Sequence, residues 1–72
     1  MGKYSHPKGP TVMLSDKLET SSGYYEVVWA KDGNLNAASK RGHDKNFRIK
    51  TKAVAFAHKK ARDIGAKNVL MP

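Results

Sequence analysis

The sequence predicts an α+β fold: a small antiparallel sheet (a hairpin or three-strand meander), one covering helix and a short C-terminal strand, in the order ββ(β)αβ. Three observations lead to this prediction. Residues 51–64 show the one clear helical period. Residues 24–30 read Y-Y-E-V-V-W-A, the aromatic and β-branched composition of a strand. The Asp-Gly pair that follows them is a strong hairpin signal. One face of the sheet should be covered.

Length and composition limit the protein to one small domain. A chain of 72 residues buries only about 60% of its unfolded surface, so its core is thin. It has no cysteine, which excludes disulfides and thiolate metal sites and fits a reducing compartment. No apolar run approaches the roughly 18 residues that span a membrane. We therefore expect no membrane partner.

The N-terminal third of the chain differs in composition from the rest. We expect residues 1–22 to form a flexible arm that could contain a short strand or turn, and residues 23–72 to form a compact domain. Residues 1–10 contain two prolines and two glycines and show no period. Residues 11–14, T-V-M-L, could pair as an edge strand, and residues 15–20 could make one helical turn.

In the predicted strand at residues 24–30, Tyr25, Val27 and Trp29 should face the core, because Glu26 marks the other face as solvated. A turn at residues 31–34 leads to a predicted return strand at residues 35–41.

Residues 41–46 are expected to be a polar loop. Residues 47–50 alternate again, with Phe47 and Ile49 inward and Arg48 and Lys50 outward. They either extend the return strand past a bulge or form a third strand.

The helical segment should begin after Thr51 as N-cap and end at Gly65, where a left-handed residue is favoured. One sector of it is apolar and faces the sheet: Ala53, Val54, Ala57, Ala61 and Ile64. Residues 68–71 give a last strand, and the helix is long enough to let that strand run parallel to a neighbour.

Catalytic and metal-binding constellations are not apparent. The six carboxylates share no strand or helix face, and no Gly-rich phosphate loop occurs. His6, His43 and His58 fall on an arm, a loop and a helix, without the converging ligands a metal needs. We expect a non-catalytic protein with no cofactor, no metal and no small-molecule substrate.

The strongest functional signal is charge. The formal net charge is +8, and residues 31–72 account for all of it, with eleven Lys or Arg against three Asp. Such a field attracts polyanions. Arg48, Lys50 and Lys52 are spaced by two, so an extended chain would project them on one side. The predicted binding patch comprises Lys40, Arg41, Lys45, Arg48, Lys50, Lys52, Lys59 and Arg62, with Lys60 beside it on the helix.

Aromatic residues could add to that patch. Tyr24, Tyr25 and Trp29 could stack on bases. The alternative, which we favour for Trp29 and one tyrosine, is that they pack in the core, because the chain has few other large apolar residues.

The strand-turn-strand region followed by T-K-A-V-A-F-A-H-K-K-A-R-D-I-G-A-K-N-V resembles small phage-encoded ββαβ regulators that bind bacterial RNA polymerase. The resemblance covers roughly residues 24–71. It implies transcription regulation and host takeover, by inhibition or antitermination, in the cytoplasm of the bacterial host.

Two functional hypotheses follow. In the first, a monomer docks on host RNA polymerase through its basic patch, with Met13, Leu14 and Leu18 as an apolar contact. In the second, the protein binds DNA or RNA by itself with little sequence preference, because phosphate contacts carry no sequence information.

Overall fold

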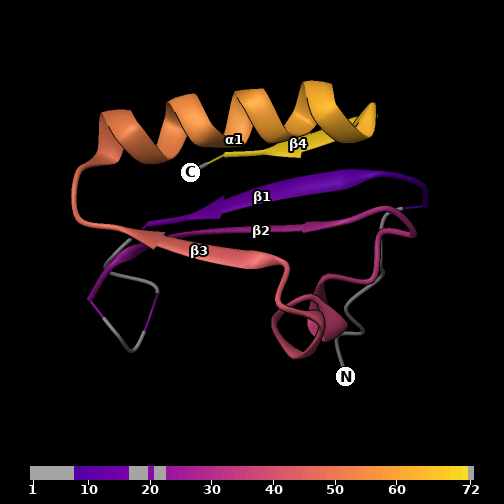
Figure 1. Cartoon of the computed structure of the whole chain (residues 1–72), viewed down its shortest axis with the longest axis horizontal. Helices are drawn as coiled ribbons and strands as arrows, with labels where there is room; N and C mark the ends of the chain where they lie inside the picture. Colours follow the sequence, from indigo (N-terminus) through magenta and orange to yellow (C-terminus); the bar gives the residue numbers. More distant parts are fainter. Residues whose placement is uncertain (1–7, 17–19, 21–22, 72) are drawn as a thin grey trace.

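The computed structural model of the chain describes residues 8–16, 20 and 23–71. The elements, in chain order, are β1 (Thr11–Ser15), β2 (Tyr25–Ala30), two 3-10 helices η1 (Leu35–Ala37) and η2 (Ser39–Arg41), β3 (Asp44–Phe47), α1 (Lys50–Ile64) and β4 (Asn68–Leu70). Figure 1 shows α1 lying across one face of the sheet. The α+β fold in the order ββ(β)αβ is therefore confirmed.

The four strands form one mixed sheet in the order β3-β2-β1-β4. The β1–β2 and β2–β3 pairs are antiparallel. The β1–β4 pair is parallel, as the length of the crossover helix allows. The C-terminal strand thus ends beside the first strand of the chain (Figure 1).

The first strand is interior, not the edge strand that the sequence suggested. Val12 is fully buried and pairs with Trp29 on one side and Val69 on the other. The sheet therefore includes Thr11–Ser15, which lie before residue 23. Residues 1–7, 17–19 and 21–22 of the expected arm, and with them most of the helical turn expected at residues 15–20, lie outside the described residues.

The helix packs on the sheet through small side chains. Ala53 and Ala57 are fully buried, and the whole predicted apolar sector contributes to the core that contains Val12, Leu14 and Val27. An alanine surface lets the helix backbone approach the sheet closely. The predicted core face of β2 is confirmed as well, because Tyr25, Val27 and Trp29 all belong to this core.

The start of the helix differs from the prediction. Helix α1 begins at Lys50 with Ile49 as N-cap, and no side chain caps it, so Thr51 lies within the first turn. The reason is visible in the backbone, where the Ile49 carbonyl accepts hydrogen bonds from the N–H groups of Lys52 and Ala53. The helix therefore starts directly after the bend that follows β3.

The end of the helix matches the prediction. Gly65 adopts φ 64° and ψ 45°, the left-handed conformation. Its N–H donates to the Arg62 carbonyl, and the N–H of Ala66 donates to the Ala61 carbonyl at 2.8 Å. This pair of bonds is a Schellman motif, which satisfies carbonyls that the helix end would leave free.

Replacing Gly65 by alanine should destabilise the fold by about 1 kcal/mol, because an L-residue is strained in the left-handed region. Apart from the glycine and its chain neighbours, no atom of the described residues lies within 4 Å of the added Cβ, so the cost is one of backbone conformation and not of collision. Urea unfolding measures it. The control is Gly65→Asn, which tolerates this conformation and should cost less. Equal costs for both variants would contradict a conformational origin.

The predicted return strand at residues 35–41 is wrong. These residues form η1 and η2, which lie on the side of the sheet opposite to α1 (Figure 1). Leu35 and Ala38 are buried there against Val28 and Ala30 of β2. The face of β2 that Glu26 marks as solvated is therefore partly covered. This explains why Val28 and Ala30, which are apolar, share that face with Glu26.

The third strand is separate and starts earlier than expected. Strand β3 occupies part of the predicted polar loop and pairs with β2, placing Phe47 opposite Tyr25. Phe47 packs against the core as expected. Ile49, which was expected inward, is 51% exposed, because the strand ends at Phe47 and the chain bends into α1. No helix in the described part of the chain has the length and apolar character needed to cross a membrane.

Candidate polyanion-binding site

Four rings gather where β3 and the end of β2 meet α1. We call this the aromatic cluster: Trp29, His43, Phe47 and Phe56. The Phe56 ring lies 5.6 Å from that of Trp29 and 5.2 Å from that of Phe47, both in tilted arrangements. The His43 ring stacks on Trp29 with centroids 5.8 Å apart and an interplanar angle of 15°. Such offset and tilted pairs are the favoured geometries of aromatic contacts.

Strand pairing explains why these rings meet. Phe47 lies opposite Tyr25, and the carbonyl of His43 accepts a hydrogen bond from the Trp29 N–H at 3.2 Å. Side chains alternate along a strand, so positions 43, 45 and 47 share the helix-facing side with Trp29. Phe56 reaches the same place from α1. The sheet register and the helical period together therefore build the cluster.

Two lysines lie over these rings. The Lys60 ammonium is 4.5 Å from the Trp29 ring centroid and 5.5 Å from that of Phe56. The Lys45 ammonium is 5.3 Å from the Phe56 centroid and 5.6 Å from that of Phe47. Both ammonium groups are held by cation–π attraction, and neither forms an ion pair with a carboxylate of the residues that the structure describes, so both can attract an external anion.

The helix extends this charge. Lys52, Phe56 and Lys59 follow one another at spacings of four and three residues, and Lys60 lies four residues after Phe56, so all four lie along one side of α1. Lys52 and Lys59 are exposed. We call the four cations of this region the lysine flank: Lys45, Lys52, Lys59 and Lys60. Asp63 lies one turn beyond Lys59, but no ion pair joins it to these lysines in the described part of the chain.

The eight residues of the predicted patch do not form one surface. Lys45, Lys52 and Lys59 belong to the lysine flank. Lys40 and Arg41 lie on η2, on the other side of the sheet. Arg62 is on α1, three residues after Lys59 and so next to it on the helix surface, but about a third of a turn away from Phe56.

Arg48 and Lys50 lie where β3 turns into α1. Both are exposed, and the Arg48 guanidinium is 5.8 Å from the Tyr24 ring centroid. The expectation that Arg48, Lys50 and Lys52 project together fails because the chain is helical from Lys50 onward, so a spacing of two no longer keeps residues on one side.

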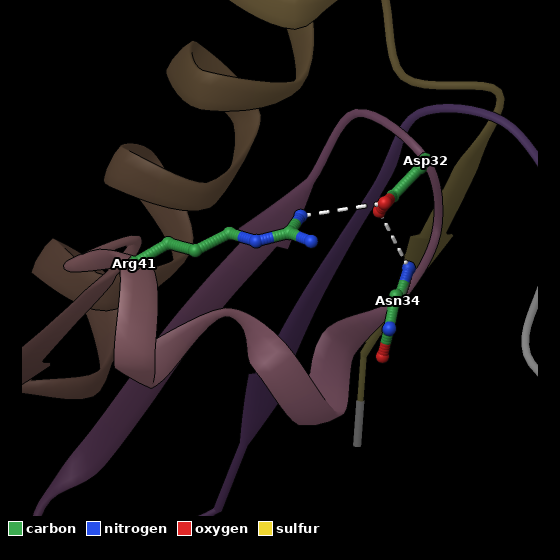
Figure 2. A network of polar contacts seen from close by, with 3 residues as sticks. All are labelled: Asp32, Asn34 and Arg41. Carbon is green, nitrogen blue, oxygen red and sulfur yellow. Dashed lines mark hydrogen bonds and ion pairs between the residues drawn. The ribbon is translucent and has the colours of Figure 1, made fainter.

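Arg41 has a structural contact instead. Its guanidinium lies 3.3 Å from the Asp32 carboxylate, and the other oxygen of that carboxylate accepts the Asn34 N–H at 2.9 Å (Figure 2). These two contacts join the turn after β2 to η2. The Asn34 backbone hydrogen bond and, after it, the Arg41 contact hold the pKa of Asp32 below the 3.8 of an unperturbed aspartate.

This lowered pKa predicts a pH dependence. Between the two pKa values the folded chain binds fewer protons at Asp32 than the unfolded chain, so its stabilisation is present above about pH 4 and is lost as the pH falls through the lowered pKa. In urea unfolding, the free-energy advantage of the natural protein over Asp32→Asn should shrink between about pH 6 and about pH 2.5. Groups common to both proteins cancel in this difference. A difference that stays constant over this range would contradict the assignment.

The predicted apolar contact is wrong for Leu14, which is 3% exposed and belongs to the core. Met13 packs against the cluster of buried residues under η1 and η2. Leu18 lies outside the described residues. Among the described residues, the exposed large apolar side chains are instead Ile49, Val69, Leu70 and Met71.

Sequence reasoning underestimated two members of the site. Lys60 was counted only as a helix cation that continues the patch, and His43 was placed in a polar loop, whereas both contact Trp29. The spacing of four between Phe56 and Lys60 could have indicated the first contact. The second depends on the register of β3, which was not predicted. No group of three His, Cys, Asp or Glu residues converges as metal ligands within residues 8–16, 20 and 23–71.

Comparisons of the chain with protein-family models, with curated proteins and with solved structures found no match.

Proposed function

We propose that this is a non-catalytic binding protein that holds nucleic acid on its lysine flank. The observation that carries the proposal is that no carboxylate of the described residues forms an ion pair with these lysines. Within the described part of the chain, the single ion pair is Arg41–Asp32, on the other side of the sheet from α1. The charges of Lys45, Lys52, Lys59 and Lys60 therefore face solvent or aromatic rings, and a polyanion can satisfy them with release of its counterions.

The rings favour nucleic acid over an acidic protein surface. Acidic side chains would use the ammonium groups alone, whereas a nucleotide offers both a phosphate for a lysine and a flat base for a ring. The contacts should be largely independent of sequence, because lysine is a point charge without the fixed fork with which arginine reads guanine.

The resemblance to small phage regulators suggests where this binding would occur. In that setting the protein would dock on bacterial host RNA polymerase as an inhibitor or antiterminator, and the lysine flank would contact nucleic acid entering or leaving the enzyme. Independent binding of DNA or RNA is the second candidate function, and it is favoured by two observations: Lys45 and Lys60 both lie over the Phe56 ring, and Lys52 and Lys59 lie on the same side of α1 as Phe56.

The first experiment is fluorescence anisotropy with labelled single-stranded DNA, duplex DNA and heparin, from about 50 mM salt upward. We expect binding at about 100 mM salt and a steep loss by several hundred millimolar. Failure to bind any of these polyanions at low salt would overturn the proposal.

Affinity capture from a bacterial lysate, with and without nuclease, then separates the two settings. RNA polymerase recovered after nuclease treatment supports docking on the enzyme. If nuclease removes every protein partner, the polymerase setting is wrong, and independent nucleic-acid binding is the function that remains.

A further inference from the structure

We infer that the nucleic acid held on the lysine flank is single-stranded, with a base stacked on Trp29 while Lys45 and Lys60 contact the neighbouring phosphates. This inference rests on the proposed function and makes it more specific. It follows from the arrangement of the rings and charges, in which each ammonium lies within 4.5–5.6 Å of an aromatic centroid. Ring and charge are thus side by side, like the base and phosphate of one nucleotide.

Trp29 has two kinds of partner: two rings, and one long side chain. His43 lies parallel to the indole and Phe56 packs tilted against it, both as rigid rings carried by neighbouring elements. The Nδ1 of His43 is buried and has no hydrogen-bond partner in the described part of the structure, and the ring stacks on Trp29. Lys60, in contrast, has a long flexible side chain that can move off the indole.

When a base takes the place of the Lys60 ammonium group on the Trp29 ring, binding should be favoured. A base that stacks on the indole replaces the single ammonium group with a flat surface of similar size, and such stacking contributes to the binding of single strands. The ammonium that leaves the ring gains a phosphate close by, so its charge is not left without a partner. The indole is half-buried, and therefore one side of it is already supported by the core when the base arrives.

A duplex cannot use the rings in this way. Its bases are stacked on each other, and only their edges are accessible in the grooves, whereas unpaired bases can lie on an aromatic side chain. The flank offers a duplex only phosphate contacts. Single strands should therefore bind more tightly than duplexes of the same length, by about five-fold or more for one stacked base.

Trp29 also provides the readout, since it is the only tryptophan in the chain. The experiment titrates the protein with an oligothymidylate of about 12 nucleotides, with a duplex of the same length and with heparin, a polyanion without bases, at one low salt concentration. The oligothymidylate should quench the tryptophan emission. Heparin should bind, as measured by calorimetry, with little quenching, and the duplex should bind about five-fold or more weakly than the single strand.

Two variants test the stacking contact. Trp29→Phe keeps an aromatic face and should retain most of the preference for single strands. Trp29→Leu should reduce the single-strand affinity by about five-fold or more, to the level of the duplex. Circular dichroism checks that both variants fold. If Trp29→Leu does not fold, the quenching measured with the natural protein decides the question.

The possible failures are distinguishable. Equal affinity for single strand and duplex, with unchanged tryptophan emission, would overturn the stacking inference and leave the proposed function in place. No binding of oligonucleotide, duplex or heparin would overturn both. Strong quenching of the tryptophan emission when heparin is the added polyanion would also overturn the stacking inference. It would show that displacement of Lys60, and not stacking of a base, changes the emission.

Discussion

Replacing Lys45 and Lys60 together by alanine is expected to lower the affinity for a single-stranded oligonucleotide by about ten-fold near 100 mM salt. The slope of log affinity against log salt should become shallower by about 1.4, since each phosphate contact on a single strand contributes about 0.7. The reason is that both ammonium groups are held by rings and lack a carboxylate partner in the described part of the chain. Fluorescence anisotropy across a salt series measures both effects.

The matched control is Lys31→Ala with Lys40→Ala. It removes the same amount of charge from two exposed residues that lie outside the lysine flank. If the flank is the binding surface, the control should lose no more than about two- to three-fold through the general field of the protein. Equal losses in the two double variants would mean that net charge, and not this surface, determines binding.

Replacing Leu14 by alanine is expected to cost about 2–4 kcal/mol of unfolding free energy, the largest single effect on stability that we predict. Leu14 is 3% exposed, lies in an interior strand and packs with Val27, Ala53 and Ala57. Such a loss is a large part of the total stability of a small domain, which is about 5 kcal/mol at the low end of the usual range. Urea unfolding followed by Trp29 fluorescence measures it.

The control for this prediction is the preceding residue. Met13 belongs to the same strand but packs, half-buried, on the smaller cluster on the other side of the sheet. Met13→Ala should therefore destabilise the protein less than Leu14→Ala does. If Leu14→Ala cost less than about 0.5 kcal/mol, a value typical of surface positions, β1 would not be part of the core.

Much of the fold could be predicted because local pattern determines it. The apolar sector of α1, the left-handed Gly65 and the core face of β2 all depend on residues close in sequence, and all are confirmed. Strand β4 was also predicted, although its parallel partner was not named. These are the elements in which helical or strand periodicity extends over enough residues, or in which one glycine has one suitable conformation.

The rest depends on contacts between distant residues. Five residues of β1 carry too little pattern to show that they would lie between β2 and β4. The segment 35–41 alternates like a strand, yet it folds into η1 and η2 because Leu35 and Ala38 can cover Val28 and Ala30. The sequence therefore indicated a sheet with one covered face, whereas the second face is partly covered as well.

The candidate site was predicted in part for the same reason. The charge and several of its residues were recognised, but their grouping assumed an extended chain through residues 48–52, where the helix in fact begins at Lys50. The contact of His43 with Trp29 and the separation of Lys40 and Arg41 from the flank follow from the register of β3 and from η2. Neither this contact nor this separation can be predicted from the spacing of residues along the sequence.

The most direct test of the lysine flank as a binding surface is amide chemical-shift mapping during titration with an oligothymidylate, which suits an 8.0 kDa protein. We expect the largest shifts at residues 43–47 and along the side of α1 that carries Lys52, Phe56, Lys59 and Lys60. Shifts concentrated on residues 31–41, or distributed evenly over both sides of the sheet, would contradict the assignment of this surface.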